Sequence, residues 1–572
     1  MNFIKDTLEK IIKDALTQLE YPILENVEIV RDSDRPDLSD FQSNIAMALA
    51  KQLKQNPRKI AENIVAKIDT PEIIFSIDGP GFINIILSNE FVAKILNENV
   101  SRETFNPQPQ TNPKKIIIDY GGPNVAKSLH VGHLRSSIIG EALKNLAKYK
   151  GYNVIGDIHL GDWGLPMGLI IASIKEKGLK LPLSIDELNP IYPEASKRSK
   201  VDEEFMAKAQ EETKKLQNGD KENREIWKSF WTTSVNDIKK ILSILNVNFD
   251  LWYGESTAND DVNLLVKEFK EKGLVKPSEG AEVIDLKDFP MNGTEVPPFI
   301  VIKSNGAVMY GMTDIATLYD RIKRQNADMV WYVVDARQAL HFHQVFSVAK
   351  ITDIKGDCQL EHLGFGTVLG QDSKPLKTRN GDNVSLMELI TDTLDSAKKK
   401  IEENEKTSSL PEEEKNKIAK DVGVSALKFA DLINPRTSDY IFNLDKFISF
   451  EGKTGPYILY TAVRIKSLLR DAGNDFEMRN IALANVYDKA LAIKICEFNN
   501  AVDRAFETRG IHILAQYVYD LAVCFNNFYH NVKIMTEENV NQKNSWLKLS
   551  KIVLTIFETF AKIIKIDIPE RM

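Results

Sequence analysis

Cysteine is scarce in this sequence, and its scarcity argues against two kinds of stabilisation. The three cysteines among 572 residues are Cys358, Cys496 and Cys524, and they form no CxxC pair. A disulfide framework and a structural zinc site are therefore both unexpected. We predict a protein of a reducing cytoplasm.

Long apolar runs are also missing. No segment approaches the roughly 20 apolar residues that a membrane helix needs. The N-terminal segment MNFIKDTLEKIIKDAL places Ile4, Leu8, Ile11, Ile12 and Leu16 on one helical face, but charged residues interrupt it too often for a signal peptide. We expect a soluble protein with no membrane partner.

Excess positive charge is absent, since the net charge is -7. Nucleic-acid binding without sequence preference needs a broadly basic surface, so the charge argues against that function. The 74 lysines and arginines can still cluster locally and hold an RNA partner.

The chain is long enough to require several domains. An α+β module precedes the proline-rich stretch NPQPQTNP, and in it Ser39 and Gln42 are spaced as a capping box before an apolar helical pattern. Strand and helix patterns alternate from Lys114, and after Val384 the chain becomes almost wholly helical. The expected parts are an N-terminal module over residues 1–110, a Rossmann-type parallel-sheet domain over 111–395 with a helical insertion at about 176–260, a connector over 396–450 and an all-α bundle over 451–572.

The parallel sheet is predicted from a βαβ unit. Ile116, Ile117 and Ile118 form a β-branched run, a helical pattern covers 134–149, and YNVIGDI supplies a second strand. We expect two later segments, FIVIKSNGAVMYG with a hairpin turn at Asn305 and Gly306, and MVWYVVD, to join the same sheet.

The stretch GGPNVAKSLHVGHLRS, residues 121–136, is the strongest candidate for chemistry. It follows a buried strand, opens a helix and combines glycines, a lysine and two histidines. Ligand-spaced carboxylates beside His130 are missing, which disfavours a metal cage. A plain helix start with incidental histidines is the simplest alternative. A helix N-terminus with free N–H groups and two imidazoles favours a nucleotide-phosphate site, although no P-loop or GxGxxG pattern is present.

Several segments of the chain carry a family resemblance. HVGH at 130–133 resembles the HIGH motif of class I aminoacyl-tRNA synthetases, and the wider string PNVAKSLHVGHLRSSIIGEAL resembles the arginyl-tRNA synthetase family. Further similar segments are LGDWG (160–164), YGMTDIATLYDRI (310–322), VVDARQALHFHQVF (333–346), KPLKTRNG (374–381), residues 430–461 and the terminal ERM.

This resemblance implies a two-step ligase of protein biosynthesis that uses ATP and Mg²⁺. The carboxylate of L-arginine attacks the α-phosphate of ATP, and the arginyl group of the adenylate then passes to the 2′-hydroxyl of tRNA(Arg). The resemblance implies that His130 and His133 contact the ATP phosphates and that Gly132 lets adenine lie against the backbone.

The arginine site is also implied by the family pattern. Asp119 and Asn124 are expected at the backbone end of the amino acid, and Gly122, where many relatives have serine, can contribute only backbone contacts. Tyr310, Asp314 and Gln338 are expected around the guanidinium, with Asp314 as the main ion pair. The spacing of Tyr310 and Asp314 allows one shared helix face, although Asp314 could equally serve the helix dipole.

The second class motif, KMSKS, is not intact. KPLKTRNG stands in its place, and it could also be a solvated basic loop. In the family, a lysine before the HIGH motif is thought to substitute, and Lys127 has that position. Contact with pyrophosphate is therefore open among Lys127, Lys374, Lys377 and Arg379.

The resemblance further implies that the N-terminal module binds the tRNA D-loop and the C-terminal bundle binds the anticodon. Tyr457, Tyr460, Phe528 and Tyr529 could stack on bases, but helical spacing favours core positions for most of them. We expect a monomer. Two alternatives are another HIGH-motif nucleotidyltransferase that acts without tRNA, and an inactive synthetase-like RNA-binding protein.

Overall fold

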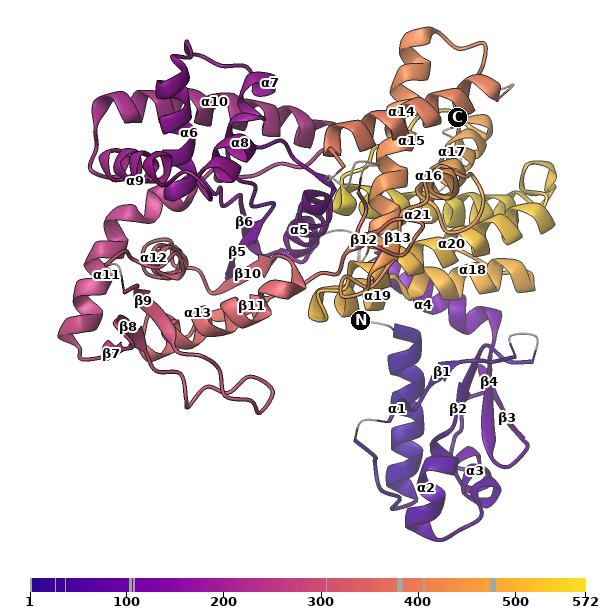
Figure 1. The fold of residues 1–572 in the computed structure, drawn as a ribbon. Helices are drawn as coiled ribbons and strands as arrows, with labels where there is room; N and C mark the ends of the chain where they lie inside the picture. The colour runs from indigo at the N-terminus through magenta and orange to yellow at the C-terminus, as the bar shows by residue number, and fades with distance from the viewer. Residues whose placement is uncertain are drawn as a thin grey trace.

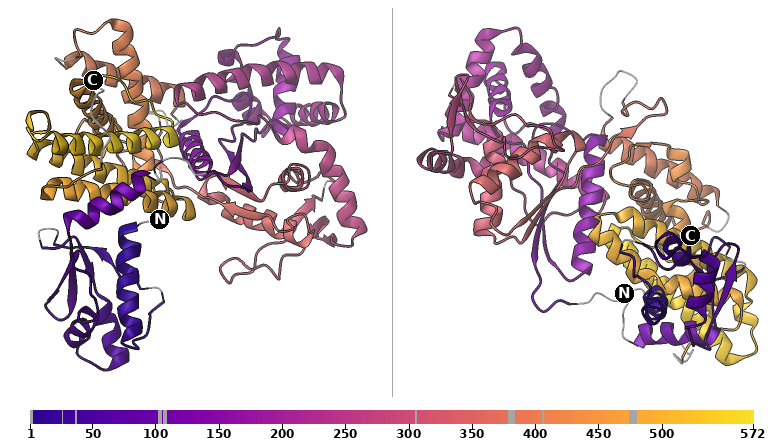
Figure 2. Two further views of the ribbon diagram at one scale, coloured as in Figure 1. Left: turned by 180° about the vertical axis from the view of Figure 1, so that it is seen from behind. Right: turned by 90° about the horizontal axis from the view of Figure 1, so that it is seen from below.

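The computed structural model describes residues 3–25, 27–35, 38–101, 105, 109–304, 306–377, 384–404, 407–473 and 480–572. Figure 1 shows three groups of elements: an N-terminal module, a part built around a parallel sheet, and a helical C-terminal part. The N-terminal module lies against the helical part and away from the parallel sheet (Figures 1 and 2). Among the residues described, no helix is long and apolar enough to cross a membrane.

The N-terminal module is a four-stranded antiparallel sheet with helices packed on it, in the strand order β1-β2-β4-β3. The predicted amphipathic helix is confirmed as α1 (Phe3–Gln18), whose Ile4, Leu8, Ile12 and Leu16 are buried. The other elements are β1 (Arg31–Asp32), β2 (Phe41–Ser43), α2 (Ile45–Leu53), α3 (Pro57–Val65), β3 (Ile73–Asp78) and β4 (Phe82–Leu87).

The predicted capping box at Ser39 and Gln42 is wrong. Gln42 lies in β2, opposite Asn84 of β4, and its side-chain amide donates to the Asn84 Oδ1 atom at 3.0 Å. Helix α2 begins only at Ile45. Pairing with a strand more than forty residues away overrides the local capping pattern, because the backbone of Phe41–Ser43 finds its hydrogen bonds in the sheet.

Helix α4 (Asn89–Ser101) attaches this module to the C-terminal helices. Asn97 makes a reciprocal pair with Ile481: its Nδ2 atom donates to the Ile481 carbonyl at 2.9 Å, and its Oδ1 atom accepts from the Ile481 N–H at 2.8 Å. Lys489 of α18 (Val486–Cys496) forms an ion pair with Asp40 at 2.6 Å. The module is therefore docked through specific polar contacts.

The parallel sheet is confirmed, with the strand order β11-β10-β5-β6 and parallel pairing throughout. Ile116, Ile117 and Ile118 of β5 are fully buried, as a strand covered on both faces requires. The strands and their helices are β5 (Lys115–Tyr120), α5 (Val131–Tyr149), β6 (Asn153–Asp157), β10 (Met329–Val333), α13 (Ala339–Ile351) and β11 (Gln359–His362).

FIVIKSNGAVMYG does not join this sheet, contrary to the prediction. Its strand β9 (Phe299–Ile302) is the edge of a separate antiparallel sheet with β7 (Lys276–Ser278) and β8 (Ala281–Ile284). A tight turn follows, in which the Gly306 N–H donates to the Lys303 carbonyl at 2.9 Å. Short turns return a chain antiparallel, whereas parallel pairing needs a long crossover. Asn305 lies outside the described residues.

Helices fill the segment between β6 and the antiparallel sheet, as the predicted insertion requires. Gly168 of α6 packs so closely on α9 that an added Cβ atom would meet the Ala209 carbonyl oxygen at 2.3 Å. These helices are α6 (Leu165–Lys177), α7 (Ile185–Leu188), α8 (Ile191–Arg198), α9 (Glu203–Gln217), α10 (Lys221–Ile244) and, after the short turn η1 (Glu255–Ala258), α11 (Asn259–Glu271).

The C-terminal part is helical, with one small parallel pair of strands. The last two long helices bury apolar residues at helical spacing, as the expected all-α bundle requires: Leu514, Val518, Leu521, Phe525, Phe528, Leu549, Val553, Ile556, Phe560 and Ile563. The elements are β12 (Val368–Leu369), α14 (Leu386–Glu403), α15 (Glu412–Leu432), β13 (Tyr440–Ile441), α16 (Leu444–Phe447), α17 (Gly455–Ala472), α19 (Phe498–Glu507), α20 (Ile511–Asn531) and α21 (Val540–Ile564).

Candidate active site

The carboxyl ends of the parallel strands bring the predicted site residues to one edge of the sheet. Asp119 near the end of β5 lies opposite Asp157 of β6 and Tyr332 of β10. The Ser136 hydroxyl accepts from the Gly121 N–H at 2.7 Å and donates to the Val333 carbonyl at 2.7 Å. This serine of α5 therefore joins the strand ends to the helix that begins at the HVGH motif.

The HVGH motif forms the N-terminus of α5, and its backbone sets the tautomer of both histidines. The Nδ1 atom of His130 accepts from the Gly132 N–H at 3.1 Å, and the Nδ1 atom of His133 accepts from the His130 N–H at 3.1 Å. Each neutral ring then carries its proton on Nε2. The rings lie 4.0 Å apart between centroids, so both Nε2–H donors come from the same helix start.

Electrostatics keep these rings neutral. Burial and the nearby charge of Lys127 lower the pKa of His130. Burial, followed by the charges of His130 and Lys127, lowers the pKa of His133 to about 3. Neutral imidazoles that donate from Nε2 suit an anionic ligand at a helix N-terminus. Gly132 is required for this packing, because a Cβ atom there would lie 2.8 Å from Cε1 of His130.

The predicted cations lie in different environments. Lys127 is half-buried, its Nζ atom lies 4.0 Å from the ring centre of Tyr192 in α8, and burial lowers its pKa. Lys374 and Lys377 are exposed, and Arg379 lies outside the described residues. The structure therefore places Lys127 beside the two histidines, and no contact of Lys374 or Lys377 with them is found in the described part of their loop.

The loop that replaces KMSKS is nevertheless anchored next to the motif. Before it, Leu369 of β12 bridges to Pro375. After it, Ser385 forms a bridge with His130, and the Val131 N–H donates to the Val384 carbonyl at 3.0 Å. Both ends of this basic segment are thus held at fixed positions, one of them against His130.

Tyr310 and Asp314 meet on one face of α12 (Gly311–Tyr319), as their spacing predicted. His341 of α13 joins them: its Nε2 atom lies 2.7 Å from the Asp314 Oδ2 atom, and its ring centroid lies 5.3 Å from that of Tyr310. Tyr310 is more than half exposed at 57%. Gln338 is exposed at the end of a short turn, η3 (Ala336–Gln338), directly before α13.

A second carboxylate, Glu255, lies within electrostatic reach of Asp314, and sequence reasoning missed it. Burial, with the negative charges of Asp314 and Asp162, raises the pKa of Glu255 to about 7. A carboxyl group in such a setting gains from a cationic partner. Its only local signal is the position at the start of η1, after Gly254, and nothing there indicates that Asp314 lies opposite.

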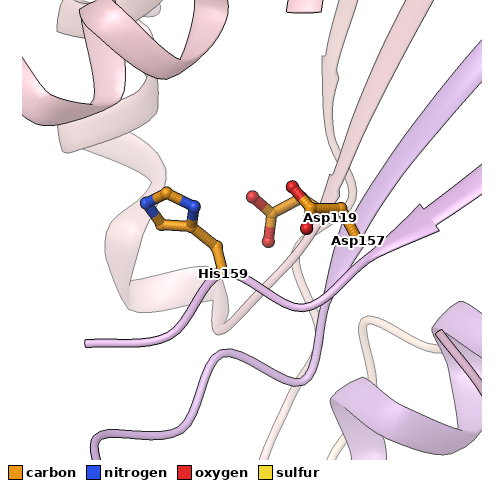
Figure 3. Close-up of side chains that lie close together, drawn as sticks. All are labelled: Asp119, Asp157 and His159. Carbon is orange, nitrogen blue, oxygen red and sulfur yellow. The ribbon is translucent and has the colours of Figure 1, made fainter. Parts of the chain in front are cut away.

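A buried group of charges lies under the strand ends. The Nη2 atom of Arg321 donates to the Oδ2 atoms of Asp119 and Asp157 at 2.7 and 2.6 Å. Arg321 belongs to the π-helical turn η2 (Asp320–Arg324) that continues α12. Figure 3 shows His159 with its ring beside both carboxylates. Arg321, Asp157 and His159 were also missed, although Arg321 follows Asp314 by seven residues and so shares its helix face.

The two groups of carboxylates are close neighbours. Burial raises the pKa of Tyr332 most strongly. The positive charge of Arg321 lowers this pKa, and the negative charges of Asp119 and Asp314 raise it. Tyr332 therefore lies within electrostatic reach of both groups.

The other two residues predicted for the backbone end of arginine lie on the loop after β5. Gly122 is exposed and adopts a φ of +40°. Asn124 pairs with Gly161, where a Cβ atom would lie 1.9 Å from the Asn124 Oδ1 atom.

The residues under the strand ends include one set of side chains that could bind a metal ion. Within the described ranges, the one grouping of potential ligand atoms is Asp119, Asp157 and His159, all within 4.8 Å of one another. Arg321 already donates to both carboxylates. The grouping therefore contains its own cation, which disfavours a resident metal ion there.

A separate cavity of about 490 Å³ lies among the C-terminal helices. Tyr460 and Tyr529 line it, and Arg464 lies over both rings at 4.8 and 5.4 Å from their centres. Arg571 and Met572 also line it. Of the other aromatic candidates, Phe528 is core and Tyr457 accepts from the Asn526 amide at 3.0 Å.

Three family descriptions match successive parts of the chain. They are "tRNA synthetases class I (R), catalytic domain" over residues 92–444, "DALR anticodon binding domain" over 458–572 and "Arginyl tRNA synthetase N terminal domain" over 6–87.

Full-length relatives agree with these matches. The arginine--tRNA ligase of Alkaliphilus oremlandii is 40% identical over 100% of both chains, and that of Agathobacter rectalis is 43% identical over 94% of this chain and 95% of its own. The crystal structure of arginyl-tRNA synthetase from Plasmodium falciparum matches with a TM-score of 0.82 at 27% identity, covering 100% of this chain and 99% of that one. The Thermus thermophilus arginyl-tRNA synthetase matches with a TM-score of 0.80 at 25% identity, covering 99% and 100%.

Proposed function

Because the chain belongs to the arginyl-tRNA synthetase family, we propose that it ligates L-arginine to tRNA(Arg) in an ATP-dependent reaction that releases AMP and pyrophosphate. The observation that carries the proposal is the combination of two Nε2–H donors at the HVGH helix start with the carboxylates of Asp314 and Glu255. Neither alternative has support: the family matches include an anticodon-binding part, and the residues of the site are intact.

The first step joins the arginine carboxylate to the α-phosphorus of ATP and breaks its bond to the bridging oxygen of pyrophosphate. His130 and His133 donate from Nε2 to phosphate oxygens while negative charge builds on them. Lys127 supplies a cation close to these histidines, because its charge lowers the pKa of both rings. Lys374, Lys377 and Arg379 of the anchored loop are available for the pyrophosphate end.

Arginine lies across the strand ends in this proposal. Asp314 accepts from the guanidinium, with Tyr310 and Gln338 at the rim and Glu255 as a second carboxylate. Asp119 and Asn124 hold the backbone end of the amino acid, and the Gly122 backbone borders it. In the second step the 2′-hydroxyl of the terminal tRNA adenosine attacks the adenylate carbonyl carbon, and AMP leaves.

Mg²⁺ accompanies ATP in this proposal. The described carboxylates near the phosphate end do not form a metal cage, and the one close grouping contains a guanidinium. The ion would therefore be held chiefly by the phosphates, and it would neutralise part of their charge.

The remaining parts of the chain serve tRNA. Residues 1–110 bind its D-loop, residues 111–395 carry the catalytic site with the insertion at about 176–260, residues 396–450 connect, and residues 451–572 bind the anticodon. The 490 Å³ cavity is large enough for a base, and its tyrosine rings and Arg464 offer stacking surfaces. We take the enzyme to act as a monomer in the cytoplasm.

Arginine-dependent exchange of pyrophosphate into ATP, measured with and without tRNA(Arg), tests the function. We expect exchange only with the cognate tRNA, and arginine charging of that tRNA. Failure of folded protein to charge any tRNA with arginine would overturn the proposal. Exchange with another amino acid would replace arginine as the substrate.

A further inference from the structure

Side-chain atoms without hydrogen-bond partners lie at the carboxyl ends of β5 and β6. Asp157 Oδ1 and both ring nitrogens of His159 are buried and have no hydrogen-bond partner among the described residues, and a neutral imidazole offers one of its two nitrogens as an acceptor. Asp119 uses its Oδ2 atom for Arg321, so its other carboxylate oxygen can accept from a further donor. Figure 3 shows the imidazole directed to the same side as the two carboxylates.

The three side chains lie close enough together to bind one ammonium group. A tetrahedral ammonium with three acceptors at about 2.9 Å separates them by roughly 4.7 Å. Ligand atoms of Asp119, Asp157 and His159 all lie within 4.8 Å of one another. An ammonium has three donors and no acceptor, so it can satisfy all three side chains at once.

The charges also match. Asp119 and Asp157 carry two negative charges when ionised, and Arg321, paired with both, carries one positive charge. The buried group therefore lacks one positive charge, which an ammonium supplies. Burial raises the pKa of Asp119, as expected for a carboxylate that is incompletely compensated.

We propose that Asp157 and His159 bind the α-ammonium group of the amino-acid substrate together with Asp119, and that Arg321 is the positioning residue that aims both carboxylates at it. The inference rests on the proposed function and adds three residues to it. Arg321 is suited to this task because it is buried, with a side chain only 1% exposed, and a single Nη2 atom bridges the two carboxylates.

Arg321 also sets the direction of the substrate. Its guanidinium already occupies one oxygen of each carboxylate, so a bidentate pair with the substrate guanidinium cannot form at this end. The substrate guanidinium is left with Asp314 and Glu255. Arg321 and Asp314 lie on the continuous segment from α12 into η2, so one element positions both ends of the site. π-Helical turns of this kind are frequent at functional sites.

Two unreactive inhibitors isolate the ammonium contact. L-Argininol carries the guanidinium and the α-ammonium, whereas 5-guanidinopentan-1-ol lacks only the α-ammonium. The ratio of their inhibition constants against arginine in tRNA charging measures what the ammonium contributes. This ratio does not depend on the folded fraction of a variant, and calorimetric titration gives it for a variant that no longer charges tRNA.

We expect the ratio to fall by about tenfold or more in Asp157→Asn, in His159→Phe and in Arg321→Lys, because each change weakens a hydrogen bond to a charged group. The inhibition constant of 5-guanidinopentan-1-ol should change little. Asp261→Asn is the matched control, since Asp261 pairs with Arg324 of the same π-helical turn rather than with Arg321. It should leave the ratio unchanged.

The outcomes separate the inference from the function. If both inhibitors weaken equally in the three variants, the residues have only a structural role and the inference is overturned. If the control lowers the ratio as much as they do, it is overturned as well. Absence of arginine charging by the wild-type protein would instead overturn the proposed function, and the calorimetric ratio would still decide the ammonium site.

Discussion

Glu255 makes arginine binding depend on pH near neutrality. In the free protein, burial and the charges of Asp314 and Asp162 raise its pKa to about 7, from an ordinary value of 4.5. A guanidinium bound beside Asp314 favours the ionised carboxylate and lowers that pKa again. Arginine therefore binds with release of a proton wherever free Glu255 is protonated.

The size of the effect follows from the pKa. Below about pH 7 the fraction of ionised Glu255 falls tenfold per pH unit, so the affinity for arginine at pH 6 should be about tenfold lower than at pH 8. Above pH 7 the affinity should level off. The α-ammonium and guanidinium groups of arginine stay charged across this range and add no slope.

Calorimetric titration of the full-length protein with L-arginine, between pH 6 and pH 8, measures this dependence. Titrations at pH 6 in buffers of different ionisation enthalpy should show release of close to one proton per arginine. Glu255→Gln is the decisive variant, because glutamine mimics the protonated acid. Its affinity should be near that of the wild type at pH 6 and should fall behind it by about tenfold at pH 8.

Two results would refute this reasoning. A wild-type affinity that is constant from pH 6 to pH 8 means that Glu255 is ionised before arginine arrives. An equal pH dependence in Glu255→Gln assigns the proton to another group. The difference between the two proteins isolates Glu255, because every other titrating group is shared.

Two further substitutions test the rest of the site, and a third tests a buried ion pair, Arg135–Asp431, that stabilises the fold. Asp314→Ala should raise the KM for arginine at least tenfold and leave the KM for ATP nearly unchanged, because the guanidinium loses its main ion pair. Steady-state charging assays in which each substrate is varied in turn measure both KM values. His133→Ala should lower kcat about 100-fold with little change in arginine affinity, since it removes a donor to the transition state; unchanged turnover would remove its phosphate role. Arg135 and Asp431 form an ion pair at 3.0 Å, and each side chain is only 1% exposed. Asp431→Ala should therefore lower the free energy of unfolding in urea by about 3–5 kcal/mol, because it leaves the buried arginine without its partner. A loss under about 1 kcal/mol would show that water reaches the arginine.

Much of the architecture is readable in the sequence, because it depends on neighbours a few residues apart. The buried face of α1, the β-branched core of β5 and the apolar rhythms of α20 and α21 repeat with helical or strand period, and the structure buries them accordingly. The placement of Tyr310 and Asp314 on one helix face could also be predicted from the sequence, because four residues make about one helical turn. In the structure, His341 contacts both side chains.

Other features depend on distant partners. Ser39 and Gln42 have the spacing of a capping box, yet β4 pairs with this segment as a strand, and β9 follows its own hairpin into an antiparallel sheet. A local pattern shows which structure is favoured, but a competing pairing can outweigh it.

The charged groups of the site show the same limit most clearly. Asp119 and Arg321 are separated by 202 positions, and Asp157 and Arg321 by 164, yet they share hydrogen bonds of 2.7 and 2.6 Å. The sequence alone determined the periodic elements and the motif that opens α5. The tertiary structure decided the pKa of Glu255 and the free acceptors beside His159, because burial and charge–charge distances exist only after the strand ends meet.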